Sequence, residues 1–366
     1  MKTLLLLGGG HAHIEVLRAL GAAPVEGWRV VLVSPFVRQL YSGMVPGVVA
    51  GHYALDACAI DLRALCRRAN ATFQRGTASL IDPARREVVL ADGTSARYDL
   101  LSMNIGGQTF IGKAQGVEQN AIVIRPLETA MEAWLGVLER ATKGEVRSLT
   151  IVGAGAGGIE LALAMHHRFR GISPAPHVRV IGDAPALGEI PSGARERLLR
   201  LARANDIGVH TGHAATEVGP DYVQLEGGMQ FASDATFWTT GTAAPDLARD
   251  SGFVTDPGGY LLTNDYLQST SHPHVFGVGD CAVQQGRARP RAGVFAVRAA
   301  PVLAANLRAV MGGGALAPHV TSARYLALVS GGDKYVVGFW GGFSWEGAWA
   351  WRWKNRIDRE FVGKYA

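Results

Sequence analysis

Two stretches of the chain repeat one pattern of hydrophobic and polar positions. Each stretch begins with a short apolar run, passes through a glycine-rich turn into a run with helical spacing, and closes with a second apolar run. The repeat predicts two βαβ units of the kind that build dinucleotide-binding folds. The apolar runs and the helices between them are residues 4–7, 14–20 and 30–33 in the first stretch, and residues 149–152, 159–167 and 178–181 in the second.

The rest of the chain contributes further short strands and one long helix. Residues 86–90 and 98–103 flank an Asp-Gly turn, which predicts a hairpin in a small sheet laid over the first unit. Residues 275–280 indicate a buried strand that ends in a glycine and an acid, and a helix follows over about residues 294–310. The two glycine turns are too far apart for one unit, so each belongs to its own domain.

We therefore predict an α/β fold with two Rossmann-like dinucleotide-binding domains, the second inserted in the first. Residues 1–120 and 255–320 would form the first domain, and residues 121–254 the second. Residues 321–366 would form a short C-terminal segment, which is distinct because five of the eight tryptophans lie between Trp340 and Trp353.

Composition places the chain among soluble globular proteins, with 48% apolar and 18% charged residues. Residues 1–7 end at glycines without a cleavage site, so they are predicted to form a strand and not a signal peptide. No stretch approaches the roughly 20 uncharged apolar residues needed to cross a bilayer, so membrane contact would be peripheral.

A net charge of +5 permits contact with anionic surfaces but does not indicate which kind of surface. Three cysteines without CxxC spacing favour a reducing compartment, the cytoplasm.

The glycine-rich turns carry the chemistry of these units. Residues 8–13 have the pattern G-x-G-x-x-H, where Gly8 permits the tight turn and Gly10 lets the backbone approach a pyrophosphate at the helix N-terminus. His13 replaces the third glycine, so its side chain must point aside or the helix must stand further from the strand. Residues 153–158 complete the pattern G-x-G-x-x-G, which predicts a dinucleotide site.

An acid near the end of the strand after each turn commonly binds the ribose hydroxyls. In the second unit this acid is Asp183, which has no arginine nearby and therefore favours NADH over NADPH. In the first unit the position is Ser34, which leaves the ribose contact open, with Arg38 as an alternative.

Four features, read in order, resemble the two-dinucleotide-binding flavoproteins: the first glycine turn, residues 98–106, the second glycine turn with Glu160, and residues 277–280. This is the fold of pyridine nucleotide-disulfide reductases, type II NADH:quinone dehydrogenases and sulfide:quinone oxidoreductases, and the resemblance covers nearly the whole chain. Three further segments resemble the NADH dehydrogenase-like flavoprotein that occurs alone or fused to selenide, water dikinase, and we expect no kinase portion here. These segments are residues 41–47, 50–53 and 351–359.

The resemblance implies two cofactors, FAD in the first domain and NAD(P)H in the second. It implies that Asp280 hydrogen-bonds the FAD ribityl chain, with a helix cap as the alternative role. Glu160 would lie between nicotinamide and flavin, with an ordinary solvated helix glutamate as the alternative. Glu160 and Pro46 are the catalytic candidates, and Pro46, Phe295 and Arg298 are candidates for the acceptor side. The predicted FAD-binding residues are Gly8, Gly10, His11, Ala12, Ser34, Ser42, Gly43, Met44, Ala78, Asn104, Gly106, Gly279, Asp280 and Phe295. The predicted NAD-binding residues are Gly153, Gly155, Gly158, Glu160, Asp183 and Gly241.

The cysteines lack the pairing that disulfide reductases and sulfide oxidoreductases need beside the flavin. Cys58 and Cys66 are predicted to be buried as small hydrophobic side chains, and Cys281 follows the acid at the flavin. The cofactors would therefore carry the redox chemistry. Histidine pairs at residues 11 and 13, 166 and 167, and 272 and 274 have no carboxylate or cysteine at ligand spacing, so no metal site is predicted.

An apolar residue recurs every four positions near the C-terminus, which predicts an amphipathic helix flanked by basic residues. Such a helix can lie in a membrane interface, or it can pack on the flavin domain or on a dimer partner. Membrane dehydrogenases of the superfamily that this chain resembles attach to the membrane through their C-terminal regions, which favours the membrane interface for this helix. The apolar positions are Trp345, Trp349, Trp353, Ile357 and Phe361.

These features predict an FAD-dependent NAD(P)H dehydrogenase that passes hydride from NADH to FAD and electrons on to a quinone-type acceptor without redox cysteines. Two alternatives stay open: a soluble flavin reductase acting on a selenium or sulfur compound, and a non-catalytic flavin-bearing binding or signalling protein. The expected location is the cytoplasm, with peripheral attachment to the inner face of the cell membrane. No nucleic-acid partner is expected, and a homodimer is left open.

Overall fold

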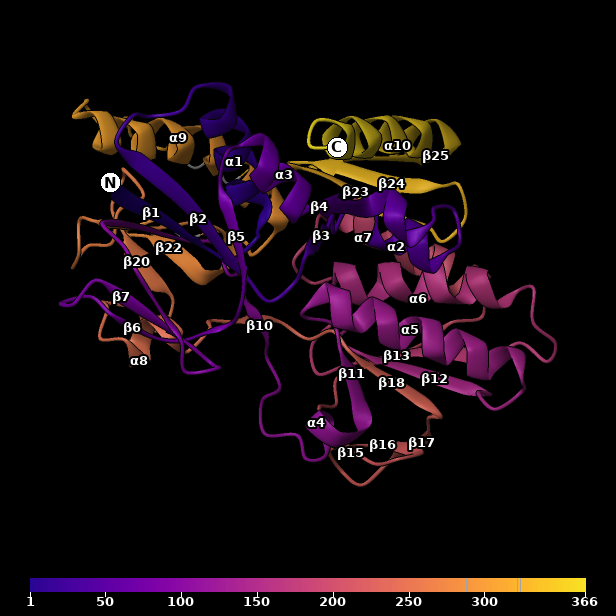
Figure 1. Cartoon of the computed structure of the whole chain (residues 1–366). Helices are drawn as coiled ribbons and strands as arrows, with labels where there is room; N and C mark the ends of the chain where they lie inside the picture. The colour runs from indigo at the N-terminus through magenta and orange to yellow at the C-terminus, as the bar shows by residue number, and fades with distance from the viewer. Residues whose placement is uncertain (288, 321, 323) are drawn as a thin grey trace.

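Two parallel sheets with helices around them make up most of the computed structural model, which describes residues 1–287, 289–320, 322 and 324–366 (Figure 1). The first sheet has the strand order β21-β9-β1-β2-β5, and every neighbouring pair is parallel. Its strands are β1 (Lys2–Leu7), β2 (Trp28–Ser34), β5 (Thr72–Arg75), β9 (Leu100–Met103) and β21 (Val275–Gly277).

Both faces of the first sheet are covered, which explains why β1 is an uninterrupted leucine run. Leu4 and Leu6 pack in one core cluster with the helices α1, α3 and α9, whereas Leu5 and Leu7 pack in another with a small antiparallel sheet, β6-β7-β8. These elements are α1 (His11–Ala22), α3 (Leu62–Arg68), α9 (Gly293–Gly312), β6 (Ala78–Asp82), β7 (Glu87–Leu90) and β8 (Ser95–Arg97).

The second sheet has the order β11-β18-β12-β13-β14 and is also entirely parallel. Its main core contains α5, α6 and α7, while the antiparallel sheet β15-β16-β17 and α4 pack on other residues of the same strands. The strands are β11 (Ala121–Val123), β12 (Ser148–Val152), β13 (His177–Gly182), β14 (Gly208–Thr211), β15 (Ala215–Val218), β16 (Tyr222–Leu225), β17 (Gln230–Ala232) and β18 (Ala235–Trp238). The helices are α4 (Val117–Asn120), α5 (Leu127–Thr142), α6 (Ala156–Phe169) and α7 (Ser192–Ala204).

The two sheets are linked by a two-stranded antiparallel contact between β10 and β19, where the chain leaves the first sheet and returns to it. The boundaries expected at residues 120, 254 and 320 stay predictions. The remaining elements before the C-terminal segment are β3 (Arg38–Leu40), α2 (Val45–Val49), η1 (Leu55–Cys58), β4 (Ala59–Asp61), β10 (Gln108–Thr109), β19 (Thr242–Ala243), α8 (Leu247–Asp250), β20 (Leu261–Thr263), η2 (Gly279–Cys281) and β22 (Ala282–Gln284).

The predicted hairpin over residues 86–103 is wrong in its second strand. The turn leads into β8, and β8 pairs with β7 as the hairpin partner. Residues 100–103 form β9, which lies parallel to β1 in the middle of the first sheet. All four residues of β9 are buried, as a central parallel strand requires, whereas a strand of a covering hairpin keeps one side towards solvent.

The C-terminal segment is a three-stranded antiparallel sheet covered by a helix, which lies at the upper right of Figure 1. The predicted helical stripe is wrong at Trp345, because this residue lies on β25 and only the positions from Trp349 onward lie on α10. Gly347, with a φ of +142°, separates the strand from the helix. The elements are β23 (Leu326–Ser330), β24 (Val336–Trp340), β25 (Phe343–Gly347) and α10 (Ala348–Gly363).

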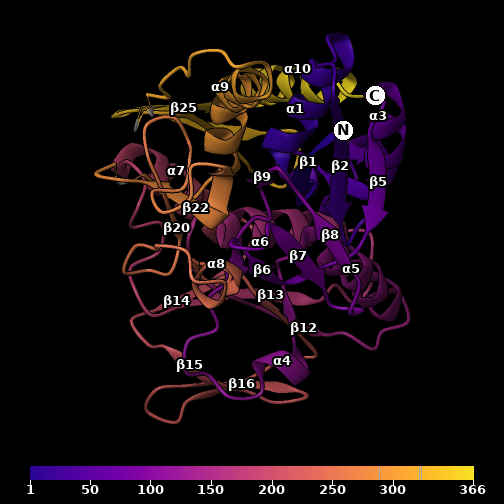
Figure 2. The same cartoon turned by 60° about the vertical axis from the view of Figure 1, so that its left-hand side comes forward.

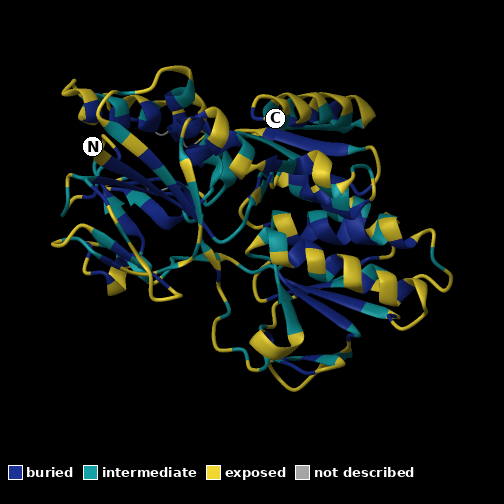
Figure 3. Cartoon of the chain, in the orientation of Figure 1, coloured by how far each residue is buried: buried dark blue, intermediate teal, exposed yellow. Residues whose placement is uncertain are grey.

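Within the described residues one helix, α9, has the length and composition to cross a membrane, although the sequence suggested none. Half of its most apolar window is buried, and it packs against α1, beside which it lies in Figure 2. Its apolar character is therefore explained by its place in the core of the first domain. The exposed surface is concentrated on the outer helices and loops, while the sheet strands are mostly buried (Figure 3).

Candidate active site

The carboxyl ends of three adjacent strands bring the first glycine turn together with two later segments. The last residues of β1, β9 and β21 lie side by side in register. The residues that follow them are Gly8, Asn104 and Val278, which therefore meet at one edge of the sheet. Open α/β sheets bind ligands at this edge.

Asn104 holds this edge together. Its Oδ1 accepts a hydrogen bond from the Ala12 amide at 2.9 Å, and its Nδ2 donates to the Val278 carbonyl at 3.0 Å. A Cβ atom on Gly10 or Gly279 would overlap the Asn104 side-chain amide. Both predicted cofactor glycines are thus needed for the close packing of this asparagine.

His13 points aside into the core, which resolves the alternatives left by the missing third glycine. Its Nδ1 lies 2.6 Å from the Gly8 carbonyl and its Nε2 lies 2.8 Å from the Ser102 hydroxyl. Because a carbonyl can only accept, Nδ1 carries the proton and the Ser102 hydroxyl donates to Nε2. Burial lowers the pKa of His13 to about 4, so the ring is neutral at pH 7. Gly8 itself has a φ of +91°.

Asp280 lies buried at the same edge with one oxygen unsatisfied. Its Oδ2 accepts from Nη1 of Arg125 at 2.9 Å, whereas Oδ1 is buried without a hydrogen-bond partner among the described residues. A buried carboxylate oxygen without a donor costs free energy, so the position suits a hydroxyl group. The FAD ribityl chain would supply such hydroxyls, and the site therefore fits this cofactor. Arg125 follows β11 of the second sheet and Asp280 follows β21 of the first, so this ion pair joins the two domains.

The segment predicted to line the flavin runs from Ser42 to Pro46 and enters α2. Met44 and Pro46 are buried, Gly43 is half-buried and Ser42 is exposed. The hydroxyl of Ser42 lies beside the first residue of α9. The imidazole of His11 lies 5.7 Å from the Tyr41 ring, and burial lowers the pKa of His11 to about 4.

The remaining predicted flavin residues lie around this edge. Ser34 is buried at the end of β2, close to the glycine turn, while the alternative, Arg38, is exposed and pairs with Asp56 at 2.5 Å. Gly106 has a φ of +75°, and Ala78 is half-buried on β6. The structure thus brings Ser34 to the turn and directs the Arg38 side chain to another partner.

The second glycine turn follows β12 at the carboxyl end of the second sheet. Gly153 has a φ of +121°, and a Cβ atom on Gly158 would overlap the Gly153 carbonyl, so helix and strand are in close contact here. Gly241 lies exposed after β18, and Asp183 is exposed one residue beyond β13.

An internal carboxylate occupies the start of α6. Oε1 of Glu189 accepts a hydrogen bond from the Ala156 amide at 3.0 Å, while the N-cap residue, Gly155, has no side chain of its own to cap the helix. The amide at this turn therefore binds a negatively charged oxygen in this structure. An anion site at a helix N-terminus fits the pyrophosphate of NAD(P)H.

Glu160 projects from α6 towards the flavin-lining segment and the C-terminal helix. Its Oε1 accepts from the Ser330 amide at 2.6 Å. Burial raises the pKa of Glu160 to about 7, against the lowering effect of the nearby Lys354 ammonium. Lys354 is buried, forms an ion pair with Asp358 at 2.5 Å and donates to the Gly43 carbonyl. One buried group of charges thus connects the second domain, the flavin-lining segment and α10.

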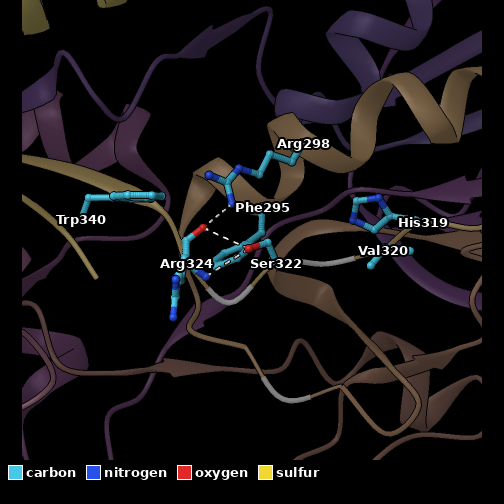
Figure 4. A pocket seen from close by; sticks show the side chains of 7 residues that line it. All are labelled: Phe295, Arg298, His319, Val320, Ser322, Arg324 and Trp340. Atoms are coloured by element: carbon cyan, nitrogen blue, oxygen red, sulfur yellow. Dashed lines mark hydrogen bonds between the residues drawn. The ribbon is translucent and has the colours of Figure 1, made fainter. Parts of the chain in front are cut away.

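A cavity of about 340 Å³ opens beside the first turn of α9 (Figure 4). Phe295 and Arg298, two of the predicted acceptor-side residues, line it, whereas Pro46 does not. Nη1 of Arg298 donates to the Arg324 carbonyl at 2.8 Å, and the Trp340 side chain is half exposed at the rim. The other lining residues are His319, Val320 and Ser322.

All three cysteines are buried and none forms a disulfide. Burial raises the pKa of Cys58, Cys66 and Cys281 to about 11 in each case. The thiols are therefore protonated at neutral pH and are poor nucleophiles.

Sequence reasoning missed several residues that the fold brings to the site. Arg125 and Lys354 bond to the predicted cofactor residues Asp280 and Gly43 from distant parts of the chain. Glu189 binds the Ala156 amide within the second glycine turn, and Asp358 pairs with Lys354. The one local signal was the position of Arg125, which directly follows an apolar strand as other site residues do.

A protein-family model described as pyridine nucleotide-disulphide oxidoreductase matches residues 2–300, and the chain belongs to this family. It is therefore an oxidoreductase that uses FAD and NAD(P)H, as the sequence predicted, and the predicted two-Rossmann fold class is confirmed.

Two curated relatives and one solved structure are similar to this chain. The chain is 24% identical over 331 residues to a probable NADH dehydrogenase of Dictyostelium discoideum, covering 83% of this chain and 72% of that protein. It is 28% identical over 290 residues to the demethylphylloquinone reductase NdbB of a Synechocystis strain, covering 76% and 71%. The structure of NDH2 from Plasmodium falciparum in complex with NADH has the same fold, with a TM-score of 0.80, 14% identity and coverage of 99% and 97%.

Proposed function

We propose that this chain is an NADH dehydrogenase that passes electrons to a quinone without the use of cysteine thiols. The main support is that two polar clusters join the domains beside the glycine turns: Arg125 pairs with Asp280. Lys354, which lies near Glu160 of α6, donates to the Gly43 carbonyl of the flavin-lining segment. The names of the relatives, an NADH dehydrogenase and a quinone reductase, agree with this chemistry.

The residues of each domain have separate tasks in this proposal. Gly8, Gly10 and Asn104 shape the first turn for the FAD pyrophosphate, and Asp280 holds the ribityl hydroxyls. Gly153, Gly158 and the start of α6 bind the NADH pyrophosphate. Bound FAD would supply a hydride acceptor for the dihydronicotinamide and a two-electron donor for the quinone.

Glu160 is proposed as the acid–base residue between the two cofactors. A carboxyl group with a pKa of about 7 can hold or release a proton at neutral pH. Quinone reduction requires two protons as well as two electrons, and the buried pair of Lys354 and Asp358 lies next to Glu160. Pro46 is proposed to shape the flavin face, because it is buried at the start of α2.

The cavity at Phe295 is proposed as the acceptor site. It is lined by aromatic and aliphatic side chains together with the guanidinium of Arg298, a combination that suits a quinone ring with polar oxygens. Substitution of Trp340, which also lines this cavity, by Ala should raise the KM for a short-chain quinone and leave the rate of flavin reduction by NADH unchanged.

One anaerobic experiment tests the proposal as a whole. The purified flavoprotein is mixed with NADH and then with NADPH, and the flavin absorbance is followed before and after addition of a short-chain quinone. We expect NADH to bleach the flavin and the quinone to restore it within one turnover. Reoxidation by selenite or polysulfide but not by quinone would favour the selenium or sulfur alternative. Slow turnover with every acceptor would favour the binding-protein alternative.

We further propose peripheral attachment to a membrane through the C-terminal segment, which suits a quinone dissolved in lipid. Trp349 and Trp353 are exposed on the outer face of α10, and Arg352 and Arg356 lie between and beside them. Indole rings and cations are the side chains that bind the headgroup region of an anionic bilayer.

The attachment can be measured by co-sedimentation with vesicles that contain an anionic lipid. Substitution of both Trp349 and Trp353 by Ser should reduce the bound fraction strongly. Leu135, an equally exposed apolar residue on α5, provides the control when it is changed to Ser. Equal binding by the double variant, or dimer formation lost with it, would point to a protein contact at this face instead.

A further inference from the structure

The carboxylate of Glu189 lies where the second glycine turn would receive a phosphate. Its Oε1 accepts from the Ala156 amide at 3.0 Å, and the same oxygen lies 3.0 Å from the position that a Cβ of Gly155 would take. A side chain at Gly155 would crowd this oxygen, so the carboxylate lies beside the space that the glycine leaves open for a pyrophosphate.

The loop that carries Glu189 is fixed on both sides, so the carboxylate is held near the amide by the backbone. The Leu187 amide donates to the Ala154 carbonyl at 2.9 Å, which ties the loop to the glycine turn. The guanidinium of Arg195 on α7 donates to the carbonyls of Leu187, Gly188 and Ile190, on either side of Glu189.

No Lys or Arg among the residues that the structure describes forms an ion pair with Glu189. Its exposed carboxylate therefore faces solvent and the helix N-terminus, where the backbone amides carry a partial positive charge. A pyrophosphate group would need the same amide and the same partial charge.

We propose that Glu189 is an internal competitor for the dinucleotide pyrophosphate, which must displace this carboxylate from the Ala156 amide in order to bind. The inference rests on the proposed use of this turn for NADH. It assigns Glu189 as a residue that sets the affinity for the dinucleotide by opposing its binding. A lowered affinity speeds the release of NAD⁺, so each turnover can end with exchange of the nucleotide.

The test compares wild type with Glu189→Gln and Glu189→Ala in the intact flavoprotein. Binding of NAD⁺, inorganic pyrophosphate and adenosine is measured by titration of the oxidised protein. Both variants should bind NAD⁺ and pyrophosphate about two- to fivefold more tightly than wild type, because a charge at a helix N-terminus contributes on that scale. Adenosine, which has no phosphate, should bind equally to all three proteins.

Glu196→Gln provides the matched control, because Glu196 is an exposed carboxylate on the neighbouring helix α7. It removes the same charge and should leave all three affinities unchanged. Unchanged or weaker NAD⁺ binding by both Glu189 variants would overturn the inference while the proposed function stands. If no variant and no wild-type protein binds NAD⁺, the proposed function fails and the inference fails with it.

Discussion

The two glycine turns have similar local sequences, but different contacts hold the helices that follow them. In each, an Ile-Glu pair directly follows the last position of the motif, which is His13 in the first turn and Gly158 in the second. The first helix is bonded to its own domain by the His13 ring, whereas the second is in direct backbone contact with its strand. The start of the first helix is therefore anchored by a buried side chain, and the start of the second by close backbone packing.

The two glutamates of these Ile-Glu pairs show the difference most clearly. Burial would raise the pKa of Glu15, but hydrogen bonds from Arg18, Lys364 and Tyr365 outweigh it and lower this pKa to about 2. Glu160 accepts a backbone hydrogen bond and has its pKa raised by burial to about 7. Equal sequence positions thus give one structural anion and one group that titrates at neutral pH, because distant residues decide their surroundings.

The largest expected effect is the selective loss of one cofactor when a glycine of either turn is changed to Ala. Gly8→Ala places a Cβ 2.5 Å from the Asn104 carbonyl at a left-handed φ, and we expect protein without flavin. Gly158→Ala forces α6 away from the strand at about 1–3 kcal/mol, and we expect NADH binding to fall roughly 10- to 100-fold with flavin retained.

The flavin absorbance of the purified protein and the rate of its reduction by NADH measure the two losses separately. Gly157→Ala is the control, because no atom of the residues that the structure describes lies within 4 Å of its Cβ position and the residue is in the same helix. Loss of flavin from Gly158→Ala would contradict the separation of the two sites.

The second prediction concerns a substitution that places a carboxylate at the start of α1, as Glu189 is placed at the start of α6. Asn104→Asp keeps the acceptor for the Ala12 amide but adds charge and removes the donor to the Val278 carbonyl. FAD should be retained about tenfold less tightly, since a lost buried hydrogen bond alone costs about 1–3 kcal/mol. The flavin content after dialysis measures this.

Asn120→Asp removes an equivalent bond, to the Val218 carbonyl, far from both turns. This control should keep its flavin. Full flavin retention by Asn104→Asp would mean that charge at the first turn has no bearing on FAD.

The third prediction concerns the pH dependence of stability, which should differ in sign between Glu160 and Glu15. Because the pKa of Glu160 is raised from 4.5 to about 7, the folded state holds its proton more tightly than the unfolded state. Stability from this residue is complete below pH 4.5 and is lost as pH rises to about 7. At pH 8, Glu160→Gln should therefore raise the free energy of unfolding by about 1–3 kcal/mol and remove a rate inflection near pH 7.

Glu15→Gln should have the opposite sign. Its pKa is lowered in the fold, so its stabilising effect is present above pH 4.5 and is lost as pH falls towards 2. At pH 8 the variant should be about 1–2 kcal/mol less stable than wild type, with no change in the pH profile of the rate. Urea unfolding at both pH values and stopped-flow flavin reduction give the comparison, and equal signs for the two variants would refute it.

The smallest expected effect concerns the choice of nucleotide at the second turn. Asp183→Ser removes the exposed acid that is predicted to accept from the ribose hydroxyls. The preference for NADH over NADPH should fall about three- to tenfold, in line with one hydrogen bond to a charged group. Asp221→Ser, at an exposed position of the same domain, should leave the ratio of kcat/KM values unchanged.

Much of the fold could be predicted from the sequence because its signals are local. Apolar runs followed by glycines identified both βαβ units, and the acid after a buried strand identified Asp280. The pairing of strands was harder to predict from the sequence. Residues 98–103 fit a hairpin or a central parallel strand equally well until the long-range pairing is known. Trp345 fitted helical spacing although Gly347 interrupts the helix.

The missed site residues have a common physical cause. Glu189 reaches the second turn from the loop after β13, and Lys354 reaches the Gly43 carbonyl from the last helix. A contact between residues far apart in sequence leaves no periodic signal in either segment. Charged residues on a helix also suggest a solvated face, yet Lys354 and Asp358 are on the buried side of α10.

The end of α10 is bound to the first helix of the chain. Lys364 and the Tyr365 hydroxyl both contact the Glu15 carboxylate, at 2.8 and 2.9 Å, and Arg68 donates to the Tyr365 carbonyl. Force applied to the outer face of α10, by a lipid surface or by a docking protein, would thus be transmitted to the helix that begins at the flavin turn. The last helix and the helix that begins at the first glycine turn are therefore held together at these contacts, and a shift of one would displace the other.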